Sequence, residues 1–155
     1  MTPVIRVLRE DWADPDVALP EYATAGAAGA DIRANLRPED RAGGIVIAPM
    51  ARIIVPSGLR VEIPEGFEIQ LRPRSGLALK HGISLPNTPG TIDSDYRGPL
   101  GILLVNLGAE PFTVVHGERV AQMIVAPVVQ ARFALAGALA GTVRGAGGFG
   151  STGRG

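Results

Sequence analysis

Short apolar runs rich in valine and isoleucine recur along the chain between glycine and proline residues. In the runs at 59–63 and 67–71, polar residues alternate with apolar neighbours, as in a strand that has one face in solvent. The many glycines and prolines leave little room for long helices. Nine strands are therefore predicted: Val4–Leu8, Gly44–Ile47, Arg52–Val55, Leu59–Ile63, Phe67–Leu71, Leu100–Asn106, Phe112–Val115, Arg119–Val125 and Val128–Phe133.

This spacing of strands predicts an all-β fold, a β-sandwich of the jelly-roll kind with one short helix. The helix is expected from Ser75 to Gly82, with Ser75 as its N-cap and Gly82 as its stop, and its amino end would suit an anion. From Ala134 onward the chain has too little apolar content to fold by itself, so we expect a flexible, glycine-rich arm that orders on a ligand. We divide the chain into a β domain at 1–136 and this C-terminal arm at 137–155, which belongs to the same functional unit.

Composition limits the partners of the protein. Its 155 residues fit one domain, and Lys plus Arg (15) equals Asp plus Glu (15), so no overall charge attracts nucleic acid or an anionic membrane. Every positive residue except Lys80 is an arginine, whose planar fork suits phosphate oxygens. The absence of cysteine excludes disulfides and thiolate chemistry. With no signal-like start and no membrane-length apolar run, a soluble, cytoplasmic protein is expected.

The stretch Gly90-Thr91-Ile92-Asp93-Ser94-Asp95-Tyr96-Arg97-Gly98 places two carboxylates, a phenol and a guanidinium between two glycines. A β-hairpin bent by glycines can hold a carboxylate against a water while its backbone stays close to a flat ligand, which suggests hydrolysis of a small molecule. Asp93 is the stronger candidate, although aspartate is also a common turn residue. Asp95 would share a face with Asp93 and would need a cationic partner, for which we expect Arg97.

Two further segments carry candidate phosphate ligands, and each also has an ordinary structural interpretation. The segment Arg72-Pro73-Arg74-Ser75-Gly76 has two interpretations. It is either the basic end of an edge strand, or a phosphate-binding site on which a guanidinium, a hydroxyl and free helix amides converge. The segment Gly117–Gln122 is weak evidence for a phosphate site on its own, because it is equally consistent with a turn and strand that carry a solvated glutamine. His81 and His116 have no second imidazole at ligand spacing, so no metal site is predicted.

The tail contains Gly145-x-Gly147-x-x-Gly150, the spacing of a dinucleotide-binding fingerprint. Only five residues follow, so no βαβ unit can be built after it, and the Gly-Lys-Ser/Thr of a Walker A loop is missing. Two interpretations remain, a low-complexity tail or a glycine hinge that brings one aromatic to a base and polar groups to phosphates. The residues concerned are Arg144, Phe149, Ser151 and Thr152.

Taken in order, five segments resemble the five motifs of the trimeric dUTPase family, the deoxyuridine 5'-triphosphate nucleotidohydrolases. They are Ala28–Ile32, Arg72–Ala78, Gly90–Gly98, Gly117–Gln122 and Arg144–Gly153. Each match is modest, but five in the family's order and approximate spacing are highly specific. Position 30 is alanine where many members carry a larger residue, a departure that leaves the chemistry untouched.

The resemblance implies a jelly-roll subunit and a homotrimer in which each active site collects motifs from more than one chain, with the arm reaching over a neighbour's site. It implies hydrolysis of dUTP to dUMP and pyrophosphate with magnesium, which keeps uracil out of DNA and supplies dUMP for dTMP synthesis. Asp93 would be the general base that activates water for in-line attack on the α-phosphorus. Mg²⁺ would be carried by the triphosphate and waters, with Asp31 at most reaching it through a water.

The resemblance also implies roles for the remaining residues. The uracil edge would be bound by Asn87, the backbone of Gly90, Thr91, Ile92 and Asp93, and the strand near Gly101. Tyr96 would lie under the sugar and exclude a 2'-hydroxyl. The α- and β-phosphates would be held by Arg74, Ser75, Gly76 and Gln122. Arg144, Ser151 and Thr152 would close on the γ-phosphate while Phe149 covers the base. Arg119 has two open roles, contact with phosphate or pairing with a buried carboxylate such as Asp31.

Two other functions stay open at this point. A dCTP deaminase of related fold is disfavoured because the third motif has no glutamate to drive deamination. A nucleotide-dependent binding module without catalysis is disfavoured by the intact Asp93 and tail.

Overall fold

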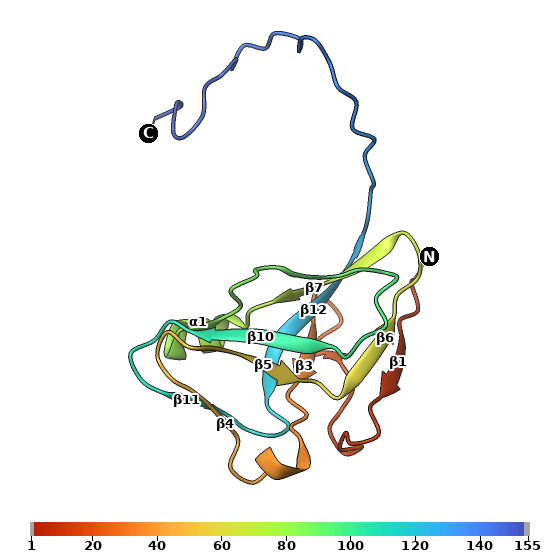
Figure 1. Ribbon diagram of the computed structural model, residues 1–155, viewed down its shortest axis with the longest axis vertical. Helices are drawn as coiled ribbons and strands as arrows, with labels where there is room; N and C mark the ends of the chain where they lie inside the picture. Colours follow the sequence, from red (N-terminus) through yellow and green to blue (C-terminus); the bar gives the residue numbers. More distant parts are fainter. Residues whose placement is uncertain (1, 154–155) are drawn as a thin grey trace.

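The computed structural model describes residues 2–153 (Figure 1). The strands are β1 (Arg6–Arg9), β2 (Glu21–Tyr22), β3 (Ala30–Arg33), β4 (Ile45–Ile47), β5 (Arg52–Pro56), β6 (Leu59–Glu62), β7 (Phe67–Arg72), β8 (Ile83–Ser84), β9 (Gly90–Ile92), β10 (Gly101–Asn106), β11 (Phe112–Val114) and β12 (Arg119–Pro127). A 3-10 turn, η1 (Pro38–Asp40), and one helix, α1 (Ser75–His81), complete the described elements. The predicted all-β, jelly-roll class is confirmed.

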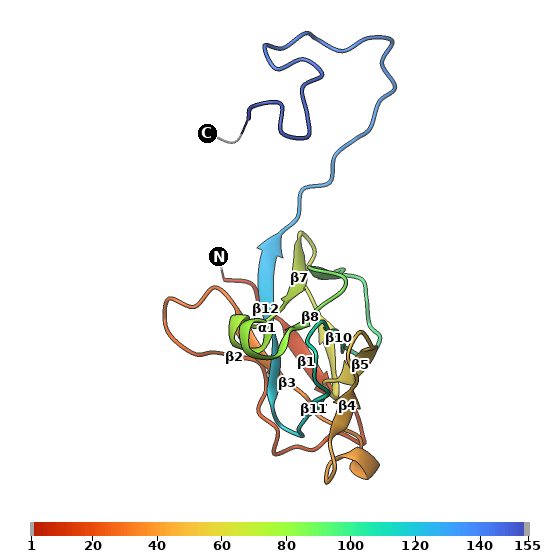
Figure 2. The same ribbon diagram turned by 90° about the vertical axis from the view of Figure 1, so that its left-hand side faces the viewer.

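The strands form two layers around one core. The largest sheet has the order β2-β3-β12-β7-β9, and the other strands form β5-β10-β8, β4-β11 and β1-β6. Figure 2 shows β3 and β12 on one side of the molecule and β4, β5 and β10 on the other. Along β10, buried Ile102 and Leu104 alternate with half-buried neighbours, and Ile69 and Leu71 do the same on β7. The period of two in the sequence is therefore the alternation between the core face and the outer face.

Eight of the nine predicted strands coincide with observed strands to within two residues at either end. The ninth, Val128–Phe133, is wrong, because this segment is irregular and exposed. β12 pairs with β7 as far as Pro127 opposite Phe67, and the Val128 N–H then donates to Gly66 O at 2.9 Å. Since β7 begins at Phe67, no described strand lies beside the chain for pairing after this point.

Helix α1 is confirmed, and Gly82 ends it in the left-handed region at φ 69°, donating its N–H to Ala78 O and Leu77 O. The predicted N-cap is wrong by one residue. Arg74 is the cap, with extended dihedrals and no capping side-chain bond, and its carbonyl accepts the first helical hydrogen bond from Ala78 N–H at 3.0 Å. Ser75 already lies inside the helix.

The loop before β2 is fastened to the core through polar contacts. Asn35, fully buried, accepts from the Asp14 N–H and donates to Asp14 O, both at 3.0 Å. His116 Nδ1 accepts the Leu36 N–H at 3.0 Å, and Nε2 lies 2.9 Å from the Asp14 carboxylate. The pKa of Asp14 is lowered, first by the hydrogen bond from the Asp16 backbone and then by that from His116.

Beyond Pro127 the chain leaves both layers as a long arm (Figure 1, Figure 2), so from here on the arm is taken from Val128 rather than from position 137. Large apolar side chains along it are more than 90% exposed: Val129, Phe133, Leu135, Leu139, Val143 and Phe149. A single chain therefore offers this apolar surface no cover. Within residues 2–153, no helix has the length and apolar character to cross a membrane.

Candidate functional site

Asp31 on β3 joins three of the five motif segments. Its carboxylate, only 6% exposed, accepts from Arg74 Nε at Oδ1 and from Arg119 Nη1 at Oδ2, both at 3.1 Å. Arg74 Nη1 also donates to Arg119 O at 3.3 Å. Two cations thus compensate a carboxylate that would be costly to bury alone. Of the two roles left open for Arg119, pairing with Asp31 is the one that the structure contains.

The other expected phosphate ligands lie beside this Asp31 cluster, which we define as Asp31, Arg74 and Arg119. Gln122 is opposite Asp31 in the β3–β12 register and opposite Arg72 in the β12–β7 register. A Cβ at Gly29 would lie 3.2 Å from Gln122 Cβ, so the first motif packs closely on this strand. Ser75 and Gly76 follow Arg74 at the exposed start of α1.

The β-hairpin expected in the stretch Gly90–Gly98 is wrong, because β9 and β10, the strands on either side of its turn, lie in different sheets. β9 pairs with β7, with Thr91 opposite Gln70, whereas β10 pairs with β5 and β8. The intervening segment crosses between the layers and is held by the Leu100 N–H, which donates to Leu59 O at 2.7 Å. β9 is consequently the outer strand of its sheet.

Two glycines of this region permit close approach of other groups. A Cβ at Gly90 would lie 3.2 Å from Asn87 Nδ2, which places the Asn87 amide directly against β9. A Cβ at Gly101 would lie 2.6 Å from Ile54 Cγ2. A larger side chain would crowd the Asn87 amide at position 90 and would displace Ile54 at position 101.

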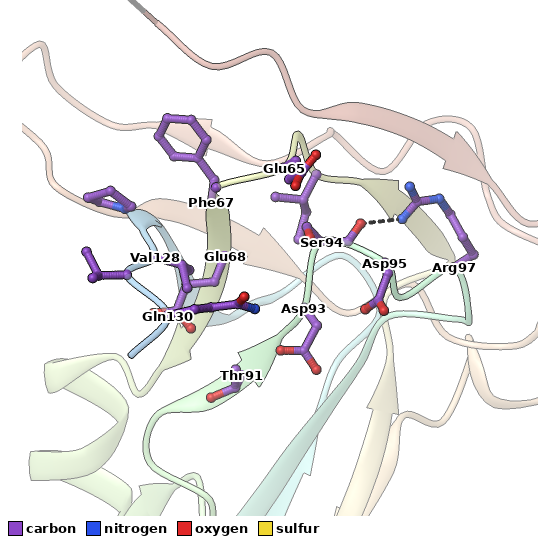
Figure 3. A pocket seen from close by; sticks show the side chains of 14 residues that line it. Glu65, Phe67, Glu68, Thr91, Asp93, Ser94, Asp95, Arg97, Val128 and Gln130 are labelled. Carbon is purple, nitrogen blue, oxygen red and sulfur yellow. Dashed lines mark hydrogen bonds between the residues drawn. The ribbon is translucent and has the colours of Figure 1, made fainter. Parts of the chain in front are cut away.

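Asp93 lies in the exposed turn that follows β9, and its carbonyl accepts the Tyr96 N–H at 3.1 Å. Figure 3 shows the carboxylates of Asp93 and Asp95 on the same side of this turn. The predicted pair between Asp95 and Arg97 is wrong. Arg97 Nη1 instead donates to Ser94 O at 2.6 Å and to Tyr96 O at 2.9 Å. Carbonyls of its own turn compete well with an exposed ion pair, which gains little in water.

Tyr96 is held at the phenol end of its side chain. Its hydroxyl donates to Pro99 O at 2.9 Å, and its ring lies so close to Gly98 that any Cβ there would collide with the phenol. The residue as a whole is still 42% exposed.

An open groove of about 1170 Å³ runs past the Asp93 turn (Figure 3). It is lined by Thr91, Asp93, Ser94, Asp95 and Arg97, by Glu65, Phe67 and Glu68 at the start of β7, and by Pro127 to Gln130. Arg74, Ser75 and Gln122 do not line it. Within one chain, the candidate base and the candidate phosphate ligands are therefore in separate places.

The candidate residues of the arm form a third group. Arg144 Nε donates to Gly147 O at 2.8 Å, and Ser151 packs on Gly147, where a Cβ would lie 2.9 Å from the hydroxyl. Phe149 has φ 48° and is fully exposed, and Thr152 lies in the following turn. This group lies away from the β layers (Figure 1, Figure 2).

No cage for a metal ion is built by the residues that the structure describes, since no three carboxylate or imidazole side chains among them converge. Both oxygens of Asp31 already accept from arginines. Magnesium commonly binds through substrate phosphates and waters rather than through a cage made only of protein groups. The side chains described here fit that mode of binding.

Sequence reasoning missed one contact of the Asp93 turn. Arg60 on β6 donates from Nη1 to Arg97 O at 3.1 Å, and its Nε donates to Glu10 Oε1 at 2.6 Å. In the sequence, Arg60 is simply a polar residue in an alternating strand. Nothing local distinguishes it from other solvent-facing positions.

Solved structures share this architecture at low sequence identity. A variant of the dUTPase of Staphylococcus bacteriophage 80alpha, with dUpNHpp, superposes with a TM-score of 0.82 at 23% identity, covering 99% of this chain and 100% of that one. The dUTPase of phage phi11 of S. aureus, in a structure that shows the coordination of a structural Mg(II) ion, has a TM-score of 0.71 at 21% identity over 87% and 97% of the two chains. The fold class of the protein is thus a jelly-roll β-sandwich.

Sequence comparisons identify the family. The dUTPase family profile matches residues 16–153. The deoxyuridine 5'-triphosphate nucleotidohydrolase of Dinoroseobacter shibae is 67% identical over 155 residues, the whole of both chains. That of Roseobacter denitrificans is 62% identical over 143 residues, 92% of this chain and 91% of the relative. The chain belongs to the dUTPase family, and it is an enzyme that hydrolyses dUTP.

Proposed function

We propose that the enzyme converts dUTP to dUMP and pyrophosphate by attack of a water molecule on the α-phosphorus, with Asp93 as the general base. Asp93 would accept a proton as the water oxygen bonds to phosphorus, and the bond from phosphorus to the bridging oxygen would break as pyrophosphate leaves. The observation that carries this proposal is the exposed Asp93 carboxylate at the edge of a large groove, on a turn fixed by backbone hydrogen bonds.

The α- and β-phosphates would bind at the Asp31 cluster. Arg74 uses Nε and Nη1 in the contacts with Asp31 and the Arg119 carbonyl, so its Nη2 can meet a phosphate oxygen. The cluster holds two guanidinium groups against one carboxylate and keeps a net positive charge for an anion. Gln122, Ser75 and Gly76 would add neutral donors.

Uracil would bind along β9. As the outer strand of its sheet, β9 has backbone groups on one side with which no strand among residues 2–153 pairs, and Asn87 lies beside it. Backbone donors that meet the C4 carbonyl of uracil would be left unpaired by cytosine, so dCTP would be a poor substrate. Tyr96, held by Pro99, would form the wall that excludes a 2'-hydroxyl.

The separation of the three groups of candidate residues supports active sites shared between chains of a homotrimer. The arm of one chain would cover the site of another, so that Arg144, Ser151 and Thr152 meet the γ-phosphate and Phe149 covers the base. The exposed apolar side chains of the arm would gain a partner in the same way.

Mg²⁺ would arrive with the triphosphate and neutralise part of its charge. The supply of dUMP for nucleotide metabolism follows the resemblance, and the cytoplasmic location remains an expectation from the sequence.

The proposed base is tested by Asp93→Asn, with Asp95→Asn as the matched variant on the same side of the turn. We expect Asp93→Asn to keep nucleotide affinity within about tenfold and to lose turnover about 100-fold or more, because the water loses its proton acceptor. Asp95→Asn should keep most of its turnover. Single-turnover pyrophosphate release measures the effect. An unchanged rate in Asp93→Asn would reject this assignment.

The substrate is tested by the same assay across dUTP, dTTP, dCTP and UTP. We expect pyrophosphate release with dUTP and little with the other three nucleotides. Ammonia release from dCTP would indicate a deaminase instead, and nucleotide binding without any product would indicate a binding module.

A further inference from the structure

We propose that Arg60, oriented by Glu10, is a positioning residue that holds the turn carrying Asp93. This inference rests on the proposed role of Asp93, since it concerns how that carboxylate is kept in place. Neither Arg60 nor Glu10 belongs to any of the five motif segments.

The Asp93 turn is organised through its carbonyl groups rather than through its acidic side chains. Arg97 donates to the carbonyls of Ser94 and Tyr96, and the Asp93 carbonyl accepts the Tyr96 N–H. In the part of the chain that the structure describes, the carboxylates of Asp93 and Asp95 make no ion pair within 4.0 Å. The position of Asp93 therefore depends on what fixes the backbone of the turn.

Arg60 supplies a fixed point from outside the turn. Its Nη1 donates to the Arg97 carbonyl at 3.1 Å, while its Nε donates to Glu10 Oε1 at 2.6 Å. The Glu10 side chain is 16% exposed, and the Glu10 N–H donates to Gly58 O at 2.8 Å, so the carboxylate is itself held against the strand pair. A planar guanidinium fixed at one edge aims its other donors in a set direction, which lysine cannot do.

The same pair of strands contains a matched control. Arg6 on β1 pairs with Glu62 on β6 at 3.4 Å, and the two side chains are 74% and 49% exposed. Among the residues that the structure describes, the side chain of Arg6 donates hydrogen bonds to Glu62 and none to the Asp93 turn. Replacing Arg6 thus removes an arginine–glutamate pair from the same ladder without touching the proposed support.

The expected kinetic effect falls on turnover, because small errors in the placement of a catalytic group are costly. We expect Arg60→Met to lower kcat for dUTP about tenfold with KM within about threefold. Arg60→Lys and Glu10→Gln should lower kcat in the same direction, and Arg6→Met should change it less than about twofold. Steady-state kinetics on folded protein, checked by thermal unfolding, measures these effects.

Two readouts separate positioning from a general loss of stability. In the Asp93→Asn background, Arg60→Met should change the residual kcat less than about twofold, because the group that it positions is gone. Amide hydrogen exchange at Tyr96, whose N–H bonds to the Asp93 carbonyl, should accelerate in Arg60→Met and stay unchanged in Arg6→Met.

The proposal is overturned if Arg60→Met matches Arg6→Met in kcat and in Tyr96 exchange, or if its tenfold loss persists in the Asp93→Asn background. Full turnover in Asp93→Asn alone would remove the proposed base. In that case, unchanged Tyr96 exchange in Arg60→Met would also rule out Arg60 as a support of the turn. Faster Tyr96 exchange in Arg60→Met would still support that role for Arg60.

Discussion

Three arginine side chains in the candidate site each bridge two acceptors. Arg74 joins Asp31 to the Arg119 carbonyl, Arg97 joins two carbonyls of its own turn, and Arg60 joins Glu10 to the Arg97 carbonyl. A guanidinium can do this because its donors point in fixed, coplanar directions. The use of arginine in place of lysine, evident in the composition, is thus a positioning device as well as a preference for phosphate.

At the residue scale, Asp31→Asn should weaken both folding and substrate binding. The amide keeps the shape of the side chain but leaves two guanidinium groups facing each other, so we expect a loss of about 1–2 kcal/mol in unfolding free energy, moderated because the arginines reach solvent. KM for dUTP should rise about tenfold as Arg74 loses its orientation. Urea unfolding and steady-state kinetics measure the two effects.

The control for this variant is Asp11→Asn, an exposed aspartate outside the cluster. It should change the free energy of unfolding by less than about 0.5 kcal/mol. Equal urea midpoints for the two variants would show that the Asp31 cluster does not stabilise the fold.

At the scale of elements, alternation predicted the longer strands because the core face is buried at every second residue, as at Ile102 and Leu104. It missed β3, in which Ala30, Asp31 and Ile32 are all buried and do not alternate, and the two-residue strands β2 and β8, whose assignment depends on a partner rather than on their own pattern. The dependence on a partner also explains two other errors. Val128–Phe133 has a strand-like sequence but no neighbour, and β9 and β10 are close in sequence but pair in different sheets.

The end of α1 provides a test at this scale. Gly82→Ala should lower the free energy of unfolding by about 1–3 kcal/mol, because φ is +69° and a Cβ would lie 2.5 Å from Gly108 N. Gly43→Ala, where a Cβ would meet nothing within 4 Å, should stay within about 0.5 kcal/mol. Urea unfolding of both variants measures the difference. A Gly82→Ala protein as stable as Gly43→Ala would mean that the helix end relaxes without strain.

At the scale of the whole molecule, the candidate residues could be named from the sequence through their resemblance to the family motifs. The way in which these residues group in space could not be predicted from the sequence, because it depends on contacts between segments that are distant along the chain. Arg74 and Asp31 lie 43 residues apart and meet only through the folding of β3 against β12 and β7. The groove beside Asp93 and the distant arm show that one chain does not bring the groups together.

Removal of residues 144–155 tests the arm. We expect turnover with dUTP to fall sharply, because the residues proposed to cover the γ-phosphate are gone, while light scattering should still detect the proposed trimer. Mixing this truncated chain with Asp93→Asn chains, after unfolding and joint refolding, should restore part of the activity, since some sites would combine an intact Asp93 with an intact arm. Normal turnover in the truncated protein would show that the arm has no part in the reaction.

The uncovered apolar side chains of the arm have a consequence for measurement. If neighbouring subunits supply their cover, mass action makes the activity per subunit depend on protein concentration. Dilution would then separate the subunits and inactivate the enzyme before any single subunit unfolds. Rates obtained at very low enzyme concentration would report assembly as well as chemistry.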